Sequence, residues 1–278
     1  MPKTSPSSSS PTTGEPGASA LSSSYVRLAR YIYAADLVAG KRILDLGCAD
    51  GEGAALLLDR GAQSVVGLDV DAQAVSRGQS RQSARLQLRA VTAEQLLTEG
   101  GLLRLVAGMT FDVIFVSGDR SWLKAPGFLS ALRWLLSPTG QLLWATCSRE
   151  AFPHATGAIG YFELLDALEG ARLGPVTMLG QSPFYAAALA PFGATDPALI
   201  LDDTLAPSES PDEYVALCGQ APNRPFEVVR LPRQSLQAGV RVEKQEVRVP
   251  DPQVVAERDK LTAELAQVLR DRDGLRDK

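Results

Sequence analysis

The sequence holds few of the residues on which several common kinds of functional site depend. Among 278 residues there is one histidine, His154, and there are three cysteines, Cys48, Cys147 and Cys218. A single histidine excludes a multi-histidine metal site, and nothing supports a site built from carboxylates and thiolates, so we expect no metal. The cysteines lie far apart, each inside an apolar run. They indicate buried thiols in a reducing cytoplasm rather than a disulfide framework.

The sequence also lacks an excess of positive charge and any long apolar run. Its formal net charge is -4 and its pI is about 5.2. No net basic field would gather nucleic acid, so we expect no nucleic-acid partner, although this leaves room for a local basic patch. No apolar run approaches the roughly 20 residues of a membrane span. The first residues, MPKTSPSSSS, lack the apolar core of a signal peptide, which predicts a cytoplasmic protein.

The composition changes at both ends of the chain. Residues 1–24 contain nine serines and four prolines, which predicts a disordered tail, and we favour a solubilising leader over a phosphorylated docking arm. Residues 236–278 are interpreted as a linker and the start of a charged helix or coiled coil. Seven acidic and six basic residues lie within 251–278, where Val254, Leu261, Val268 and Leu275 recur every seven positions. A lone charged helix and a coiled coil continuing in a longer protein, able to self-associate, remain alternatives.

Between these ends, apolar strands alternate with helical stretches, which predicts a parallel sheet with helices on both faces. Helices are expected at 25–38, with Ser24 as N-cap and Gly40 beyond the end, and at 54–59, 72–81 and 161–169. Strands are expected at 42–46, 64–68, 86–90, 111–116, 140–146, 175–179, 184–189 and 214–217. A turn is expected at 180–184 and a loop at 190–212. Trp122, Trp134 and Trp144 are expected in the core rather than on a stacking surface.

The stretch most informative about function is ILDLGCADGEG at residues 43–53, where an expected apolar strand is followed by a glycine-rich turn and a helix. Glycine lets a backbone approach a ligand closely, although tight turns use the same spacing without a ligand. Asp69 follows Gly47 by 22 residues and ends the next strand, where an acid can bind two ribose hydroxyls. Glu94 follows the third strand. The alternatives are that Asp69 caps the helix beginning near Ala72 and that Glu94 caps or solvates the next helix.

The ordered segments ILDLGCADGEG, VVGLDVD, TAEQL, FDVIFVSGD and LSPTGQLLWAT resemble the class I S-adenosylmethionine-dependent methyltransferases over about residues 25–147. An acid at Asp45, before Gly47, favours this family over dehydrogenases, which prefer a different glycine turn. The resemblance implies an α/β fold: a doubly wound, mostly parallel seven-stranded sheet, Rossmann-like, within a domain at 25–235. It also implies S-adenosylmethionine as cofactor and S-adenosylhomocysteine as product. Similar methyltransferases followed by a coiled coil occur in bacteria.

The resemblance assigns roles to individual positions. Asp45 would order the glycine turn and face the amino group of the methionine moiety, Asp69 would bind the ribose, and Val70 would pack on adenine. Ala93 and Glu94 would meet the adenine edge, and Ser117 would lie beside the sulfonium. Tyr25, Arg30 or Tyr31 could close over the methionine carboxylate. The implied cofactor-binding residues are Tyr31, Asp45, Gly47, Cys48, Ala49, Gly51, Asp69, Val70, Ala93, Glu94 and Ser117.

The sequence departs from the family pattern in ways that leave catalysis open. Ala49 replaces the second glycine of the turn, and Thr139 a glycine before the fifth strand. No histidine or acid–histidine pair follows the fourth strand. Asp119, His154 and Tyr161 are candidate bases, but each has a structural alternative: a helix cap, an exposed loop residue and a helix anchor respectively.

Three functions fit these features. The first is an active methyltransferase that modifies a small molecule or a glycan or lipid precursor. The second is a pseudo-methyltransferase that binds cofactor, or nothing, as a scaffold in a coiled-coil assembly. The third is a nicotinamide-dependent oxidoreductase, because such enzymes bind their nucleotide with the same succession of a strand, a glycine turn, a helix and an acidic residue.

Overall fold

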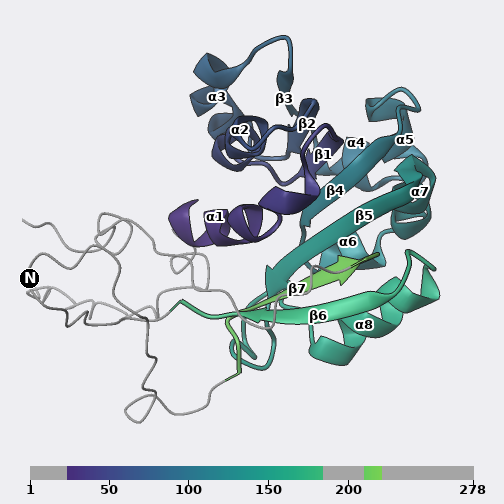
Figure 1. Cartoon of the computed structure of the whole chain (residues 1–278). Coiled ribbons are helices and arrows are strands. Elements are labelled where there is room, and N and C mark those ends of the chain that lie inside the picture. Colours follow the sequence, from purple (N-terminus) through teal and green to yellow (C-terminus); the bar gives the residue numbers. More distant parts are fainter. Residues whose placement is uncertain (1–23, 184–209, 221–278) are drawn as a thin grey trace, which may run out of the picture. The chain divides into compact units, whose positions relative to one another are not determined.

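The computed structural model describes residues 24–183 and 210–220, and these form a seven-stranded sheet with helices on both faces (Figure 1). The strand order is β3-β2-β1-β4-β5-β7-β6. All neighbours from β3 to β5 pair in parallel, and β7 runs antiparallel to both β5 and β6. The predicted fold class, a doubly wound and mostly parallel sheet, is therefore confirmed.

The strands follow the apolar runs of the sequence. Their bounds are β1 Arg42–Leu46, β2 Ser64–Asp69, β3 Leu86–Ala90, β4 Phe111–Ser117, β5 Leu136–Cys147, β6 Val176–Gln181 and β7 Glu213–Cys218. The four parallel strands β1 to β4 end within a residue of their predicted positions. The long β5 begins four residues before the predicted start, and the pairing register with β4 shifts between Phe111 and Val113.

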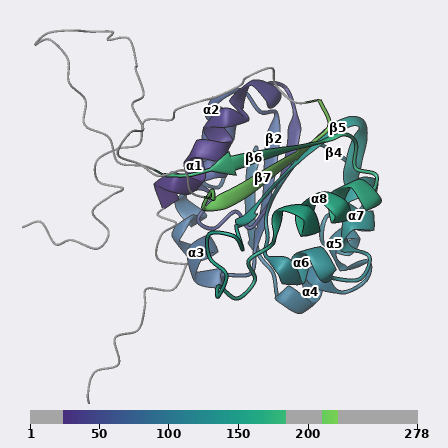
Figure 2. The ribbon, with the colours of Figure 1, turned by 90° about the horizontal axis from the view of Figure 1, so that it is seen from below.

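Helices divide between the two faces of the sheet (Figure 2). The first group lies on one face and comprises α1 Ser24–Tyr33, α2 Glu52–Asp59 and α3 Ala72–Arg77, with short 3-10 turns at Ala35–Leu37 and Gln79–Arg81. The second group covers the other face and comprises α4 Ala93–Leu97, α5 Gly101–Leu105, α6 Arg120–Lys124, α7 Phe128–Leu135 and α8 Tyr161–Gly170.

Successive side chains of the central strands point to opposite faces of the sheet, and the sheet thereby separates two hydrophobic layers. On β5, Leu142 and Trp144 pack toward α4–α8, whereas Leu143 packs toward α1–α3. All three are buried, as are Leu44 and Ile43 of β1, which face opposite layers. Strands buried on both faces read as continuous apolar runs, which is why the sequence located them well.

Some predicted elements were wrong in extent. The first helix ends at Tyr33 rather than residue 38, and a 3-10 turn replaces its last residues. The helix expected at 72–81 ends at Arg77 and is likewise followed by a 3-10 turn. The turn expected at 180–184 is wrong at Gly180 and Gln181, which pair with β7 as part of β6. The tail before residue 24, the strand at 184–189, most of the 190–212 loop and the charged segment at 251–278 lie outside the described residues.

Two of the three tryptophans lie in the core as expected. Trp144 is fully buried and Trp122 nearly so, but Trp134 is 77% exposed. Helix α7 buries Phe128 and Leu135 with Ala131 and Leu132, and this three-to-four spacing puts Trp134 on the outer side. The prediction for Trp134 was wrong because it used local hydrophobicity rather than helical period.

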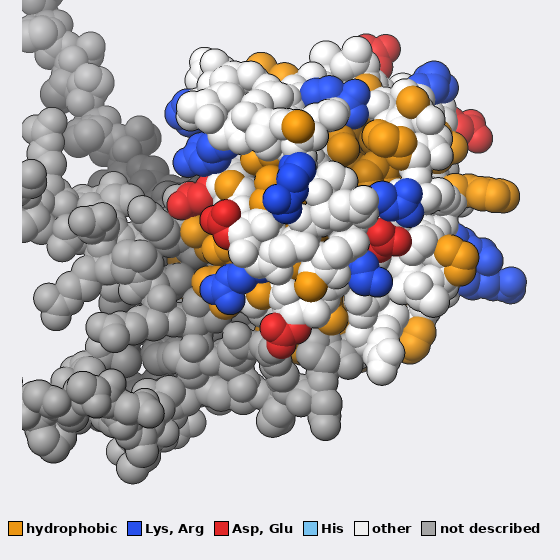
Figure 3. Space-filling model, turned by 45° about the horizontal axis from the view of Figure 1, so that its top comes forward, with side chains coloured by type: hydrophobic (Ala, Val, Ile, Leu, Met, Phe, Trp, Pro, Cys, Tyr) orange, Lys and Arg blue, Asp and Glu red, His pale blue; other side chains and the backbone are white. Residues whose placement is uncertain are grey.

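Two of the three cysteines belong to these hydrophobic layers. Cys48 and Cys218 are buried, as expected, but Cys147 is only half-buried. On the face shown in Figure 3, side chains of both charges are interspersed with apolar ones. Among the described residues, no helix is long and apolar enough to cross a membrane.

The contrast between Trp144 and Trp134 gives a matched test of the packing. Trp144 packs edge-to-face on Phe128 at 6.2 Å and donates from Nε1 to the Gly118 carbonyl at 3.3 Å. We expect Trp144→Ala to lower the free energy of unfolding by about 3–5 kcal/mol. Trp134→Ala, as the control, should change it by less than about 0.5 kcal/mol. Urea unfolding of both variants measures this, and equal losses would contradict the assigned core.

Candidate functional site

The loop between β1 and α2 is shaped by close contacts within the protein. Gly47 has φ +81°, and a Cβ atom there would lie 2.6 Å from the carbonyl oxygen of Ser117 at the end of β4. Ala49 adopts φ +52°, a conformation that is uncommon without glycine. Gly47 is thus required by the approach of β4, and the loop crosses the carboxyl ends of β1 and β4.

The same loop ends in a left-handed N-cap that starts α2. Gly51 has φ +75°, and a Cβ there would meet the side chain of Leu88 at 2.5 Å. The first N–H groups of a helix have no partner inside the helix. Here Glu52 donates only a long hydrogen bond, 3.4 Å, to Asp50 Oδ1. The turn therefore directs backbone donors toward the edge of the sheet.

Asp69 ends β2 and is fastened to this loop through its carboxylate. Oδ2 accepts from the Ala49 N–H at 2.6 Å, and Oδ1 accepts from the Asp71 N–H at 2.8 Å. Asp69 does not cap the following helix; Asp71 does, accepting from the N–H groups of Gln73 and Ala74. The alternative interpretation of Asp69 as a cap for that helix is therefore wrong.

The residues present fit an adenosyl group at this point. Each carboxylate oxygen of Asp69 has a second lone pair, so the side chain can accept from two neighbouring hydroxyl donors. Val70, the next residue, is 44% exposed, although valine is usually buried. A vicinal diol and a flat apolar ring are the groups that such a pair can bind.

A buried tyrosine–aspartate contact joins α1 to β1. The Tyr31 hydroxyl lies 3.0 and 3.1 Å from the two carboxylate oxygens of Asp45, and its ring stacks on Phe115 at 5.0 Å. Burial raises the pKa of Asp45 to about 7, although the hydrogen bond from Tyr31 and the charge of Arg30 act to lower it. Burial, followed by the charge of Asp45, raises the pKa of Tyr31 as well.

Two further contacts hold α1 on the sheet. Arg30 is 6% exposed and its Nη1 lies 3.4 Å from Glu213 Oε2 of β7. Its buried Nε makes no hydrogen bond to any residue that the structure describes. Gln181 Nε2 at the end of β6 donates to the Val26 carbonyl at 2.9 Å. The cavity left between α1 and the glycine loop, lined by Arg27, Leu28, Tyr31, Gly47, Cys48, Asp50, Glu52 and Gly53, measures only about 10 Å³.

The residues predicted at the adenine edge lie on α4. Ala93 and Glu94 are its first two residues, and the helix is capped by Thr92 in a reciprocal pair with Gln95, not by Glu94. Glu94 is exposed and lines a shallow hollow of about 500 Å³ with Gln95, Thr98, Gly101, Arg104 and Leu105. The capping alternative for Glu94 is thus wrong, and its solvated position is what the structure shows.

The three candidate bases do not converge. Asp119 is the N-cap of α6 and accepts from the Ser121 N–H at 2.7 Å. His154 is exposed in the loop after β5. Tyr161 begins α8, and its ring packs on Tyr214 at 5.6 Å. The described residues contain no group of three histidine, cysteine, aspartate or glutamate side chains that could hold a metal ion.

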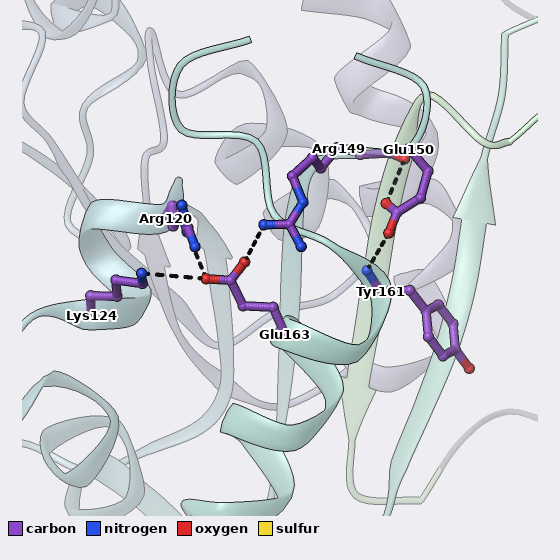
Figure 4. Close-up of polar contacts among 7 residues, drawn as sticks. Arg120, Lys124, Arg149, Glu150, Tyr161 and Glu163 are labelled. Atoms are coloured by element: carbon purple, nitrogen blue, oxygen red, sulfur yellow. Dashed lines mark hydrogen bonds and ion pairs between the residues drawn. The ribbon is translucent and has the colours of Figure 1, made fainter. Parts of the chain in front are cut away.

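Sequence analysis missed a group of charged residues near Asp119. We call Arg120, Lys124 and Arg149, which surround Glu163, the basic cluster (Figure 4). Only the four-residue spacing of Arg120 and Lys124 is visible in the sequence. Arg149 and the central Glu163 come from separate segments that only the fold brings together.

The buried Tyr31–Asp45 contact predicts a pH-dependent stability effect. In Tyr31→Phe, the Asp45 carboxylate loses its donor, so its folded-state pKa should rise further above the unfolded value. A raised acid pKa removes stability as pH rises, so the loss should be larger at about pH 8, about 1–3 kcal/mol, than at about pH 5. Urea unfolding at both pH values checks this, with Tyr161→Phe as the control. Equal losses at the two pH values would count against it.

Comparison with known proteins identifies the domain. Residues 43–140 match the family model described as a methyltransferase domain. None of the curated proteins compared with the sequence matches it.

Several solved structures are similar at low sequence identity. The methyltransferase domain of bacterial CtHen1-C is 15% identical, covers 72% of this chain and 100% of its own, and has a TM-score of 0.47. A SAM-dependent methyltransferase from Archaeoglobus fulgidus is 15% identical, with coverages of 71% and 93% and a TM-score of 0.49. The N-methyltransferase NodS from Bradyrhizobium japonicum is 16% identical, with coverages of 70% and 92% and a TM-score of 0.46.

These likenesses are too distant to transfer an activity or a substrate to this chain. The family match itself spans the glycine loop, Asp69 and the end of β4, the parts from which the candidate site is built. Residues 43–140 therefore form a methyltransferase domain, for which S-adenosylmethionine is the cofactor.

Proposed function

We propose that the chain is an active methyltransferase that moves the methyl group of S-adenosylmethionine to a small molecule or to a glycan or lipid precursor. One observation carries the proposal: the Asp69 carboxylate is fixed to the Ala49 and Asp71 N–H groups while keeping two free lone pairs. A carboxylate preorganised in this way can bind a ribose without first giving up other contacts.

The chain's own residues would hold the cofactor along the carboxyl edge of the sheet. Asp69 would accept from the ribose hydroxyls and Val70 would cover one face of adenine. The backbone of Gly47, Cys48, Ala49 and Gly51 would pass beneath the ligand, and Ser117 would lie beside the sulfonium. The bound cofactor supplies a methyl group already activated on sulfur, so the protein must mainly align the acceptor and remove its proton where it has one.

Asp119 is the residue that we propose takes a proton from the acceptor. Asp119 uses one oxygen, Oδ1, to cap α6 by accepting from the Ser121 N–H and hydroxyl. Its other oxygen accepts no hydrogen bond within the described residues, and Asp119 follows Ser117, the last residue of β4, by two positions. Among Asp119, His154 and Tyr161, the position directly after β4 favours Asp119, because the resemblance places the sulfonium beside Ser117.

A second candidate function, the pseudo-methyltransferase, is favoured by the closed arrangement of α1. The Tyr31 hydroxyl is hydrogen-bonded to Asp45, and the cavity between α1 and the glycine loop has room for about one water molecule. A methionine chain could enter there only after α1 shifts. In a scaffold, α1 would stay closed, and residues 251–278, outside the described part, would mediate assembly.

Calorimetric titration with S-adenosylhomocysteine tests the cofactor site. We expect micromolar binding by the wild type and a loss of about 10- to 100-fold in Asp69→Ala, because two charge-assisted hydrogen bonds disappear. Asp59→Ala, which removes an exposed carboxylate at the far end of α2, should bind like the wild type. Thermal unfolding of each variant shows that it is folded. Equal affinity in the wild type and Asp69→Ala would refute the proposed ribose contact.

A second experiment separates the enzyme from the scaffold. Incubation of the full chain with methyl-labelled S-adenosylmethionine and a small-molecule cell extract should yield a labelled product. Asp69→Ala should form less product, in proportion to its lost cofactor affinity. Stable binding of S-adenosylhomocysteine without any labelled product, together with dimers that dissociate when residues 251–278 are removed, would favour the scaffold.

A further inference from the structure

The basic cluster joins three segments that lie far apart in the sequence. Arg120 Nε and Lys124 Nζ of α6 lie 2.6 and 3.7 Å from Glu163 Oε1, and Arg149 Nη1 lies 2.8 Å from Glu163 Oε2. Figure 4 shows all three cationic groups pointing at one carboxylate. The cluster therefore has a single anionic centre shared by three positive charges.

The charges of the cluster do not balance. Partial burial acts to raise the pKa of Glu163, but the hydrogen bond and charge of Arg120, with the charges of Arg149 and Lys124, outweigh it and lower the pKa. Glu163 is thus ionised at neutral pH, and the four side chains carry two net positive charges.

Nearby carboxylates are engaged elsewhere. Glu150 accepts from the Tyr161 N–H at 3.1 Å, which starts α8, and Asp119 accepts from the Ser121 N–H at 2.7 Å, which starts α6. Each of these carboxylates accepts a hydrogen bond from an N–H group in the first turn of a helix. They reduce the field around the cluster, but neither forms an ion pair with Arg120, Lys124 or Arg149 among the described contacts.

The two arginines keep donors available at the edge of the sheet. Arg120 uses only Nε and Arg149 only Nη1, so the other guanidinium nitrogens make no hydrogen bond within the described residues. Their side chains are 43% and 42% exposed. Arg120 lies three residues after β4 and Arg149 two residues after β5, two strands that pair in parallel at Ser117 and Ala145.

We propose that the basic cluster binds an oxyanion group of the methyl acceptor, a phosphate or a carboxylate. This inference rests on the proposed function, because the carboxyl edge of β4 and β5 is where the acceptor would meet the methyl group. A guanidinium binds an oxyanion through two parallel hydrogen bonds, and Lys124 adds a point charge. Glu163 holds both guanidinium groups in place, which lowers the entropy lost when the anion binds.

Direct titration with inorganic phosphate and with acetate tests the site without the natural acceptor. In the full chain saturated with S-adenosylhomocysteine, NMR signals of the Arg120 and Arg149 Nε–H groups should shift and saturate with a dissociation constant of about 1–10 mM. The double variant Arg120→Gln, Arg149→Gln, which lacks both Nε–H signals, should lose this binding as read from the backbone amide signals of residues 119–124. Arg133→Gln, which removes an exposed arginine on α7, should keep it.

The outcomes separate this inference from the proposed function. No saturable shift at Arg120 and Arg149, or an equal shift at Arg133, overturns the anion site while binding of S-adenosylhomocysteine leaves the methyltransferase assignment intact. Loss of S-adenosylhomocysteine binding in the wild type overturns the proposed function instead. A backbone amide spectrum of the double variant that matches the wild type shows that its fold is unchanged.

The experiment with labelled S-adenosylmethionine and cell extract can also show whether the anionic group of the acceptor is a phosphate or a carboxylate. The acceptor should be retained on an anion exchanger, and the double variant should raise the KM for that fraction about tenfold or more with little change in affinity for S-adenosylhomocysteine. Phosphatase treatment should destroy acceptor activity if the group is a phosphate and leave it if the group is a carboxylate. The inference would be contradicted if labelled product formed only from the molecules that the anion exchanger does not retain.

Discussion

The hydrogen bond from the Ala49 N–H to the Asp69 carboxylate is the contact on which the candidate site depends. It joins the loop after β1 to the end of β2, two points that are 20 residues apart in the chain. Because the bond is short and charge-assisted, it fixes the loop conformation, including the uncommon positive φ of Ala49. The carboxylate that would bind a ribose thus also builds the loop that would lie under the ligand.

A second constraint acts at the opposite end of the site. Asp45 is fully buried, and an unpaired buried carboxylate would cost several kcal/mol. The single hydroxyl proton of Tyr31 is shared between the two carboxylate oxygens of Asp45. Any ligand that moves α1 away must therefore replace this donor, and the amino group of a methionine moiety has the chemistry to do so. Opening of α1 and cofactor binding would then be coupled through one carboxylate.

The sequence located the sheet because each central strand is buried on both faces and so reads as a short apolar run. It also placed the glycine loop and Asp69 at the ends of successive strands of a parallel sheet, and the structure brings these ends together at one edge. It predicted none of the helices α4 to α7, of which α4, α5 and α6 are only five residues long, and it misplaced Trp134. It could not find the partner of Tyr31 or the companions of Arg120. These contacts join residues from 14 to 43 positions apart, and side-chain direction in the fold decides them.

The arrangement along the carboxyl edge suggests a division between the two ends of the sheet. Toward β2 lie the largely buried carboxylate of Asp69 and the exposed side chain of Val70, which suit a neutral nucleoside. Toward β5, the exposed groups are guanidinium nitrogens, which suit an anion. A sulfonium held between them would lie near Ser117, close to the neutral backbone of β4 and away from the cations of the basic cluster. Like charges would thereby be kept apart, because Arg120 and Arg149 are drawn toward Glu163 on α8 rather than toward the glycine loop.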